Sequence, residues 1–147
     1  MSANLHNSNR VSIEYQKYLS HKLASNRNTL EYYLQFNTMQ KNFVLPMQML
    51  TSLISWQSPK PIHPMPAYVL GMMIIGQVAT TVIALEKLSN LPFEHKVSDG
   101  GLRYKYIVGI NARSPIGIAL MQCQIITHNE IRDSIIIGHD WLKQNIC

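Results

Sequence analysis

The residue types that could support acid–base or metal chemistry cluster near the C-terminal end of the chain. His128 and Glu130 form a His-x-Glu pattern, and His139 lies directly before Asp140. A metal site needs three or four ligands that converge on one point, and no third ligand lies close to His128 and Glu130 in the sequence. The pattern therefore favours a polar turn at Thr127–Arg132. We expect no metal site, no cofactor and no catalytic residue.

The two cysteines are also poor candidates for nucleophilic or redox chemistry. Cys123 is flanked by Gln122 and Gln124 and has no adjacent histidine, so it is expected to be a small buried apolar residue. Cys123 and Cys147 form neither a disulfide scaffold nor a CxxC pair. The glycines match neither of the common phosphate-binding loops. These observations lean against an enzyme.

Composition places the chain among ordinary globular domains. Its 147 residues are 46% hydrophobic and only 14% charged, which excludes a disordered segment. The formal net charge of +5 is mildly basic and far below that of a histone or a nucleic-acid coat protein. Because Met1–Asn9 is polar, no secretory signal is predicted, and an intracellular protein is expected rather than a secreted one.

Residues 1–55 are predicted to form a basic helical extension. Residues 1–65 carry six Lys or Arg against two acids, and apolar residues recur at helical spacing around Tyr15 and Leu19. Leu30–Phe36 suggests a second short helix after an Asn28 N-cap. Such a surface could contact RNA or an acidic partner. Packing of its Tyr and Leu side chains against the domain is the favoured interpretation.

Residues 56–147 are predicted to form a mainly β domain. The segment opens with the proline-rich stretch Trp56–Pro66, which suits an extended connector or an edge strand. Ser98–Gly101 has the composition of a hairpin tip, and Asp140–Gln144 suits a short closing helix. Short β-branched runs follow one another at the spacing of a small barrel or sandwich, at Ile107–Ile110, Ile116–Leu120, Gln124–Thr127 and Ser134–Gly138.

Tyr68–Leu85 is an uncharged stretch with two competing interpretations. Its 18 residues just reach the length of a membrane-spanning helix. Two glycines, Gln77 and two threonines lower its apolarity, and two buried strands that meet at Gly76-Gln77 explain it better. A buried helix is a third alternative. The choice bears directly on function, because a spanning helix implies a membrane-anchored subunit of a larger assembly.

The C-terminal part resembles the retropepsins, the aspartic proteases of retroviruses and retrotransposons. In Ser134–Gln144 an apolar strand ends in Gly138, and a polar pair and two large apolar residues follow, as in the closing strand and helix of that family. Trp56–Pro59 is similar to the family's N-terminal strand entry, and the likeness extends over residues 56–147. It implies a small closed or nearly closed β-barrel of viral or retroelement origin.

The resemblance also implies site residues, and it implies that catalysis is lost. Where a retropepsin carries Asp-Thr-Gly, this chain has Ile75, Gly76 and Gln77, with no carboxylate. Asp99, Gly100 and Gly101 fall at the position of the flap tip. Retropepsins dimerise through their terminal strand, so the resemblance implies a homodimer whose interface includes the terminal residues Lys143, Gln144, Asn145, Ile146 and Cys147.

The leading functional expectation is a non-catalytic retropepsin-like module, a pseudoenzyme that acts in protein–protein association. The alternative is the small membrane-anchored subunit held by Tyr68–Leu85. A nucleic-acid-binding viral protein is the third. Pro115–Ile126 is similar to the strand pattern of plant-virus movement proteins, although Gln122 stands where that family has an aspartate. The alternation of bases and tyrosines over Arg103–Tyr106 would also suit single-stranded nucleic acid.

Overall fold

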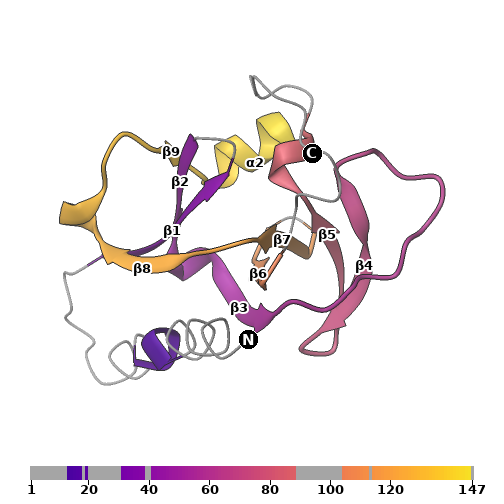
Figure 1. The fold of residues 1–147 in the computed structure, drawn as a ribbon, viewed down its shortest axis with the longest axis horizontal. Helices are drawn as coiled ribbons and strands as arrows, with labels where there is room; N and C mark the ends of the chain where they lie inside the picture. Colours follow the sequence, from indigo (N-terminus) through magenta and orange to yellow (C-terminus); the bar gives the residue numbers. More distant parts are fainter. Residues whose placement is uncertain are drawn as a thin grey trace.

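The computed structural model describes residues 13–17, 19, 31–38, 41–88, 104–112 and 114–146. These residues form two β-sheets, with one α-helix at the C-terminal end (Figure 1). Near the N-terminus, residues 13–17 are helical, and Tyr15 packs against the main hydrophobic core. A helical segment is therefore present where one was predicted, and its tyrosine packs on the domain.

The first sheet has four strands and is assembled from the two ends of the described chain. Its order is β8-β1-β2-β9, with β1 at Tyr32–Thr38, β2 at Lys41–Pro46, β8 at Gln124–Thr127 and β9 at Ile135–Ile136. The β1–β2 and β1–β8 pairs are antiparallel, whereas β9 lies parallel to β2. The short 3-10 helix η1, Met47–Met49, leads from this sheet into the second.

The second sheet has five strands in the order β3-β6-β7-β5-β4. They are β3 at Leu50–Ser55, β4 at Val69–Ile75, β5 at Val78–Ile83, β6 at Tyr106–Ile110 and β7 at Ile116–Leu120. All pairs are antiparallel except β5 with β7. The 3-10 helix η2 (Leu85–Lys87) follows β5, and the 3-10 helix η4 (His128–Glu130) follows β8. The C-terminal α-helix α2 covers His139–Asn145.

Two clusters of buried side chains hold these elements together. The larger cluster joins both sheets to α2. In α2, Leu142 is buried, and the Trp141 ring lies edge-on to the Phe43 ring with the ring centroids 6.1 Å apart. The smaller cluster lies within the five-stranded sheet and contains Ile75, Val82, Ile107 and Ala119. Because β6 and β7 are buried along their whole length, they contribute side chains to both clusters.

The proline-rich stretch before β4 acts as an extended connector that also covers an edge. Lys60 and Met72 exchange two backbone hydrogen bonds of 2.9 Å, and Pro59 is buried beside them. The chain comes so close here that a Cβ on Gly71 would lie 2.5 Å from the Lys60 carbonyl oxygen. Gly71 also has φ +152 and lies at a register shift between β4 and β5. Glycine is therefore required at this position.

Most β elements predicted from the sequence are confirmed. The strands predicted around Ile107–Ile110, Ile116–Leu120, Gln124–Thr127 and Ser134–Gly138 correspond to β6, β7, β8 and β9, and the closing helix corresponds to α2. Tyr68–Leu85 forms the β4–β5 hairpin, so the membrane-spanning helix is wrong for this stretch. Among the described residues, no helix has the length and apolarity needed to cross a membrane.

Two predictions about the architecture are wrong. The second helix expected at Leu30–Phe36 is strand β1, in which Leu34, Phe36 and Thr38 alternate as buried residues, the period of a strand. The closed or nearly closed retropepsin-type barrel is also not observed, because β3 and β4 remain the two outer strands of an open five-stranded sheet. The division of the chain at residue 56 stays a prediction, although β3, which precedes it, pairs with β6, which follows it.

Replacing Gly71 with alanine should destabilise the protein strongly. The new methyl group would meet backbone atoms of Lys60, and the backbone conformation disfavours any side chain, so we expect a loss of at least about 2 kcal/mol. Gly138→Ala is the matched control, because nothing lies within 4 Å of its Cβ position. It should change stability by less than about 1 kcal/mol. Urea unfolding of both variants checks this, and equal midpoints would contradict the close approach at Gly71.

Candidate protein-binding surface

The β4–β5 hairpin ends in a tight two-residue turn. Gly76 has φ 55 and Gln77 has φ 68, the combination of positive angles found in the turns that best fit the twist of a hairpin. Ile75 and Val78 face each other as the last pair of the ladder. The segment Ile75-Gly76-Gln77, predicted to be a degenerate catalytic loop, is therefore the tip of a hairpin.

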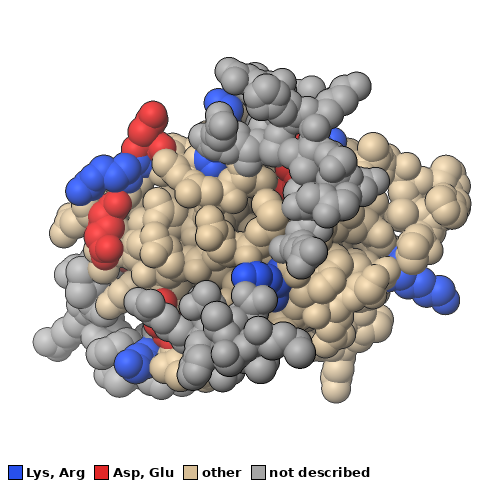
Figure 2. Space-filling model, in the orientation of Figure 1, with Lys and Arg blue, Asp and Glu red and all other residues tan. Residues whose placement is uncertain are grey.

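Apolar side chains are exposed at this hairpin end. Ile74 is 66% exposed and Val78 is 45% exposed, although both are β-branched apolar residues. Ile74 pairs with Ala79, while Val78 pairs with Ile75, so the two side chains project from opposite faces of the hairpin. In Figure 2 the surface over the lower end of this hairpin is uncharged. A protein contact at the hairpin end would cover at least one of these two exposed apolar side chains.

A pocket of about 260 Å³ opens beside the hairpin end, and we call it the hairpin pocket. Its wall combines the start of β3, the hairpin end, the end of β6 and the residues that lead into β7. None of the described residues that line it carries a charge. They are Thr51, Ser52, Ile75, Gly76, Val78, Thr80, Gly109, Ile110, Asn111, Ala112, Pro115 and Ile116.

Small residues occupy neighbouring positions of three strands beside the hairpin pocket, where the strands pack closely. Gly109 in β6 lies opposite Gly117 in β7 and opposite Ser52 in β3, so three neighbouring strands carry no large side chain here. A Cβ on Gly109 would lie 2.5 Å from Ser52 Oγ and 2.8 Å from Thr51 Oγ1. Ser52 Oγ is itself buried and has no hydrogen-bond partner among the described residues. This unsatisfied hydroxyl is packed against Gly109 and is shielded from solvent.

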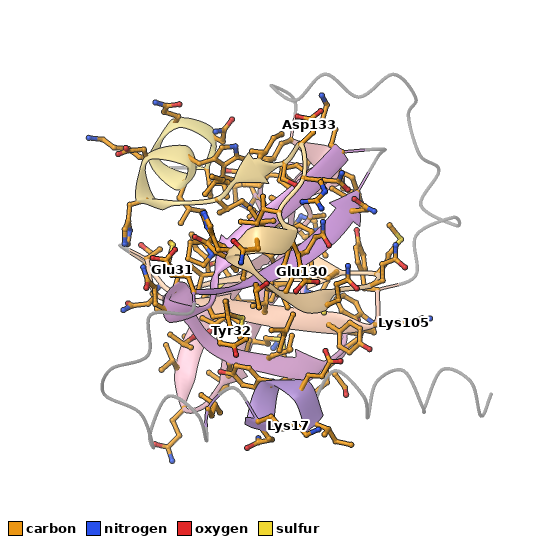
Figure 3. The ribbon with its side chains drawn as sticks, turned by 90° about the vertical axis from the view of Figure 1, so that its left-hand side faces the viewer. Lys17, Glu31, Tyr32, Lys105, Glu130 and Asp133 are labelled. Atoms are coloured by element: carbon orange, nitrogen blue, oxygen red, sulfur yellow. The ribbon has the colours of Figure 1, made fainter. Side chains whose placement is uncertain are left out.

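The candidate acid–base residues His128 and Glu130 lie in a polar turn that is closed by a helix cap. Thr127 donates two hydrogen bonds to Glu130 Oε1, from its backbone N–H at 3.1 Å and from its hydroxyl at 2.9 Å, which closes a capping box around η4. These bonds lower the pKa of Glu130. His128 Nδ1 lies 3.9 Å from Glu31 Oε2. Figure 3 shows Glu31 and Glu130 on the same side of the molecule. The polar turn predicted at Thr127–Arg132 is present, and no metal-binding group occurs among the described residues.

Cys123 is held in an unreactive form. Burial raises the pKa of its free thiol to about 12, and the negative charge of Glu14 adds to the shift. The thiol lines a small polar depression with Gln35 and Gln124, whose amides are joined by a hydrogen bond of 2.6 Å. The sequence predicted a small buried apolar residue here, and the structure places Cys123 in a half-buried position.

The remaining predicted site residues are not brought together with the hairpin end. Lys143 and Gln144 are exposed on α2, whereas Ile146 packs against the main core and its carbonyl accepts a hydrogen bond from Tyr68. A terminal interface and a homodimer therefore stay predictions. The flap-like tip Asp99-Gly100-Gly101 lies outside the described residues, as do Arg103 and Cys147.

Sequence reasoning missed Ser52, Gly109 and Ile74 as surface or pocket residues. The one available signal was the pair of glycines that interrupt two neighbouring β-branched runs, Gly109 and Gly117. Glycine inside a strand often marks a close approach or a gap in packing. Nothing in the sequence indicated which residue would face that gap, because Ser52 belongs to a distant segment.

The Cys123 thiol should react slowly with a thiol reagent in the folded protein. With a pKa near 12, its thiolate fraction at pH 8 is roughly 1000-fold below that of a free cysteine. A Cys147→Ser background isolates this thiol, and reaction with an aromatic disulfide followed by absorbance measures the rate. The same protein in denaturant is the control. Equal rates in the two conditions would contradict the burial of the thiol.

Comparison with known proteins overturns the retropepsin assignment. The CheW-like domain family matches residues 32–133. This range includes β1, β2 and β3, which were predicted to belong to a basic helical extension that precedes the retropepsin-like domain. No curated protein matches the chain. The viral or retroelement origin and the degenerate aspartic-protease site are therefore wrong. The likeness had rested on an apolar strand, a glycine and a short helix, a sequence of elements that many β proteins share.

A solved structure agrees with the family match. The scaffolding protein TtCheW from Thermoanaerobacter tengcongensis is similar with a TM-score of 0.55 and 15% identity, over 71% of this chain and 66% of that chain. At this identity the likeness establishes the fold, and this chain spans slightly less than two thirds of the length of TtCheW. The family match covers well over half of the sequence. This chain belongs to the CheW-like domain family.

Proposed function

We propose that this chain is a scaffold domain that couples protein partners in chemotaxis signalling, with a chemoreceptor and a kinase as the partner classes. The observation that carries the proposal is the CheW-like match over residues 32–133. The similar fold of TtCheW, described as a scaffolding protein, supports it. The expected non-catalytic role in protein association is retained, but on the basis of a different family.

The hairpin end supplies a physical basis for such a contact. Ile74 and Val78 are exposed apolar residues on opposite faces of the hairpin end, and the uncharged hairpin pocket lies on the Val78 side. A partner that covers these side chains would remove apolar surface from water. Each Å² of apolar surface buried in this way contributes about 25 cal/mol of favourable free energy to binding. A preorganised hairpin loses little conformational freedom on binding, so more of this gain remains as affinity.

The proposal is tested by measuring binding of the purified chain to the cytoplasmic part of a chemoreceptor and to a chemotaxis kinase from the same organism. Isothermal titration calorimetry gives the affinity of each pair. We expect the chain to bind at least one of them. Failure to bind either partner, with the fold confirmed by circular dichroism, would overturn the scaffold function.

Ile74→Asp should weaken this binding at least about tenfold, because a charged carboxylate would be buried in the contact without a partner. The matched control is Ile136→Asp, which changes an isoleucine that is 57% exposed on β9 in the other sheet. That variant should bind within about twofold of the parent protein. The opposite ranking of the two variants would place the contact on the four-stranded sheet and not at the hairpin end.

A further inference from the structure

A short helical segment lies outside both sheets, and we call it the strap. It comprises residues 13–17 and 19. Tyr15 and Leu19 of the strap are half-buried, whereas Ile13 is 54% exposed and Gln16 and Lys17 are also exposed. Residues four positions apart lie on the same face of a helix, so the strap contacts the rest of the molecule through one face. It lies below the strands in both Figure 1 and Figure 3.

The strap lies close to the Cys123 thiol. Tyr15 packs against the main core, and Cys123 and Ile125, which lie just before and within β8, pack against the same cluster. Burial is the larger cause of the raised pKa of the Cys123 thiol, and the negative charge of Glu14 adds to it, which places Glu14 near the thiol. The strap is therefore one of the elements next to Cys123.

The buried core is complete without the strap. Among the described residues, every buried apolar side chain lies between Leu34 and Leu142, whereas the strap supplies side chains that are at most half-buried. The CheW-like match likewise begins at residue 32, after the strap. The strap is therefore an addition to the part of the chain that carries the core.

A segment held in this way can open separately from the sheets. The described turns of helix gain little stability from their own hydrogen bonds, because a short isolated helix is marginal in water. The strap therefore depends on the side chains that it docks, of which Tyr15 packs against the main core. Local opening that breaks few buried contacts costs much less free energy than global unfolding. The open state of the strap is thus reached far more often than the unfolded state of the chain.

We propose that the strap opens as a unit while the two sheets stay folded, and that the docking of Tyr15 controls access to the Cys123 thiol and to the apolar side chains beside it. In the closed state, the Tyr15 side chain covers part of the main core. In the open state, a reagent or a protein partner reaches this side of the molecule. The device does not rest on the scaffold function, because both states belong to this chain alone.

Tyr15→Asp should release the strap and raise the reaction rate of the Cys123 thiol at least about tenfold, because a carboxylate docks poorly against an apolar core. The measurement uses the full chain with Cys147→Ser and an aromatic disulfide at pH 8. The added negative charge by itself would raise the pKa of the thiol and slow the reaction, so a faster reaction reports opening. Gln16→Asp places the same charge at an exposed position of the strap and is the matched control. Its rate should stay within about twofold of the parent rate.

Two further measurements separate opening of the strap from unfolding of the chain. The tryptophan emission spectrum of Tyr15→Asp should match that of the parent protein, because Trp56 and Trp141 pack against the two core clusters. In the parent protein, the reaction rate should depend little on urea below the unfolding transition, since opening of the strap exposes little surface.

The proposal is overturned by an unchanged rate in Tyr15→Asp or by an equal acceleration in Gln16→Asp. It is also overturned if Tyr15→Asp loses the folded tryptophan spectrum, or if the parent rate rises with urea in step with global unfolding. Either of these last results would make the strap an inseparable part of the core. Because no receptor or kinase enters the experiment, failure of the scaffold function leaves this outcome unaffected.

Discussion

The fold depends on one antiparallel pair of strands, β6 and β7, that is buried on both faces. Tyr106, Val108 and Ile110 point into the main core, whereas Ile107 points into the smaller cluster. In β7, Ile118 and Ala119 divide in the same way. Because alternate residues of a strand point to opposite faces, each strand supports two sets of packing contacts at once. A polar substitution at any of these positions would place a polar group in one of the two clusters and lower the stability of the fold, because neither face of β6 or β7 is exposed to solvent.

The two sheets are also linked by a polar contact at their junction. Glu86 in η2 accepts a hydrogen bond of 3.2 Å from the Thr38 hydroxyl in β1, and its other carboxylate oxygen accepts one from the Tyr104 hydroxyl. Tyr104 in turn packs against Trp56, with ring centroids 5.0 Å apart. The Glu86 carboxylate therefore connects β1 of the four-stranded sheet to η2 and to Tyr104, which lies just before β6 of the five-stranded sheet. Charge-assisted hydrogen bonds of this kind fix relative orientation more strongly than neutral ones.

The sequence predicted the β elements after residue 66 well, because β-branched runs and turn residues carry a strong local signal. It failed at Tyr32–Thr38, where apolar residues fit both a helical spacing and strand alternation. Only pairing with β2 and β8 decides in favour of a strand, and those partners are set by the tertiary fold.

The candidate surface was predictable only in part. The sequence indicated Ile75-Gly76-Gln77 as a degenerate active-site loop. It did not indicate that this segment is a turn beside the exposed residues Ile74 and Val78. Gly76-Gln77 does carry a turn signal, and the strand interpretation used it correctly. The pocket could not be predicted from the sequence, because Ser52 lies beside Gly109 only through pairing of strands that are distant in the sequence. Whether a buried hydroxyl has a hydrogen-bond partner depends on the tertiary structure around it.

The order of strands along the chain has a consequence for synthesis on the ribosome. The four-stranded sheet needs β1 and β2 from the beginning of the described chain and β8 and β9 from its end, while every strand of the other sheet lies between them. The five-stranded sheet can therefore assemble once β7 has emerged, whereas the β1–β2 hairpin gains its partner strands only when β8 and β9 have emerged. Since unpaired edges favour aggregation, nascent chains released before β8 would expose that hairpin to chaperones and proteases.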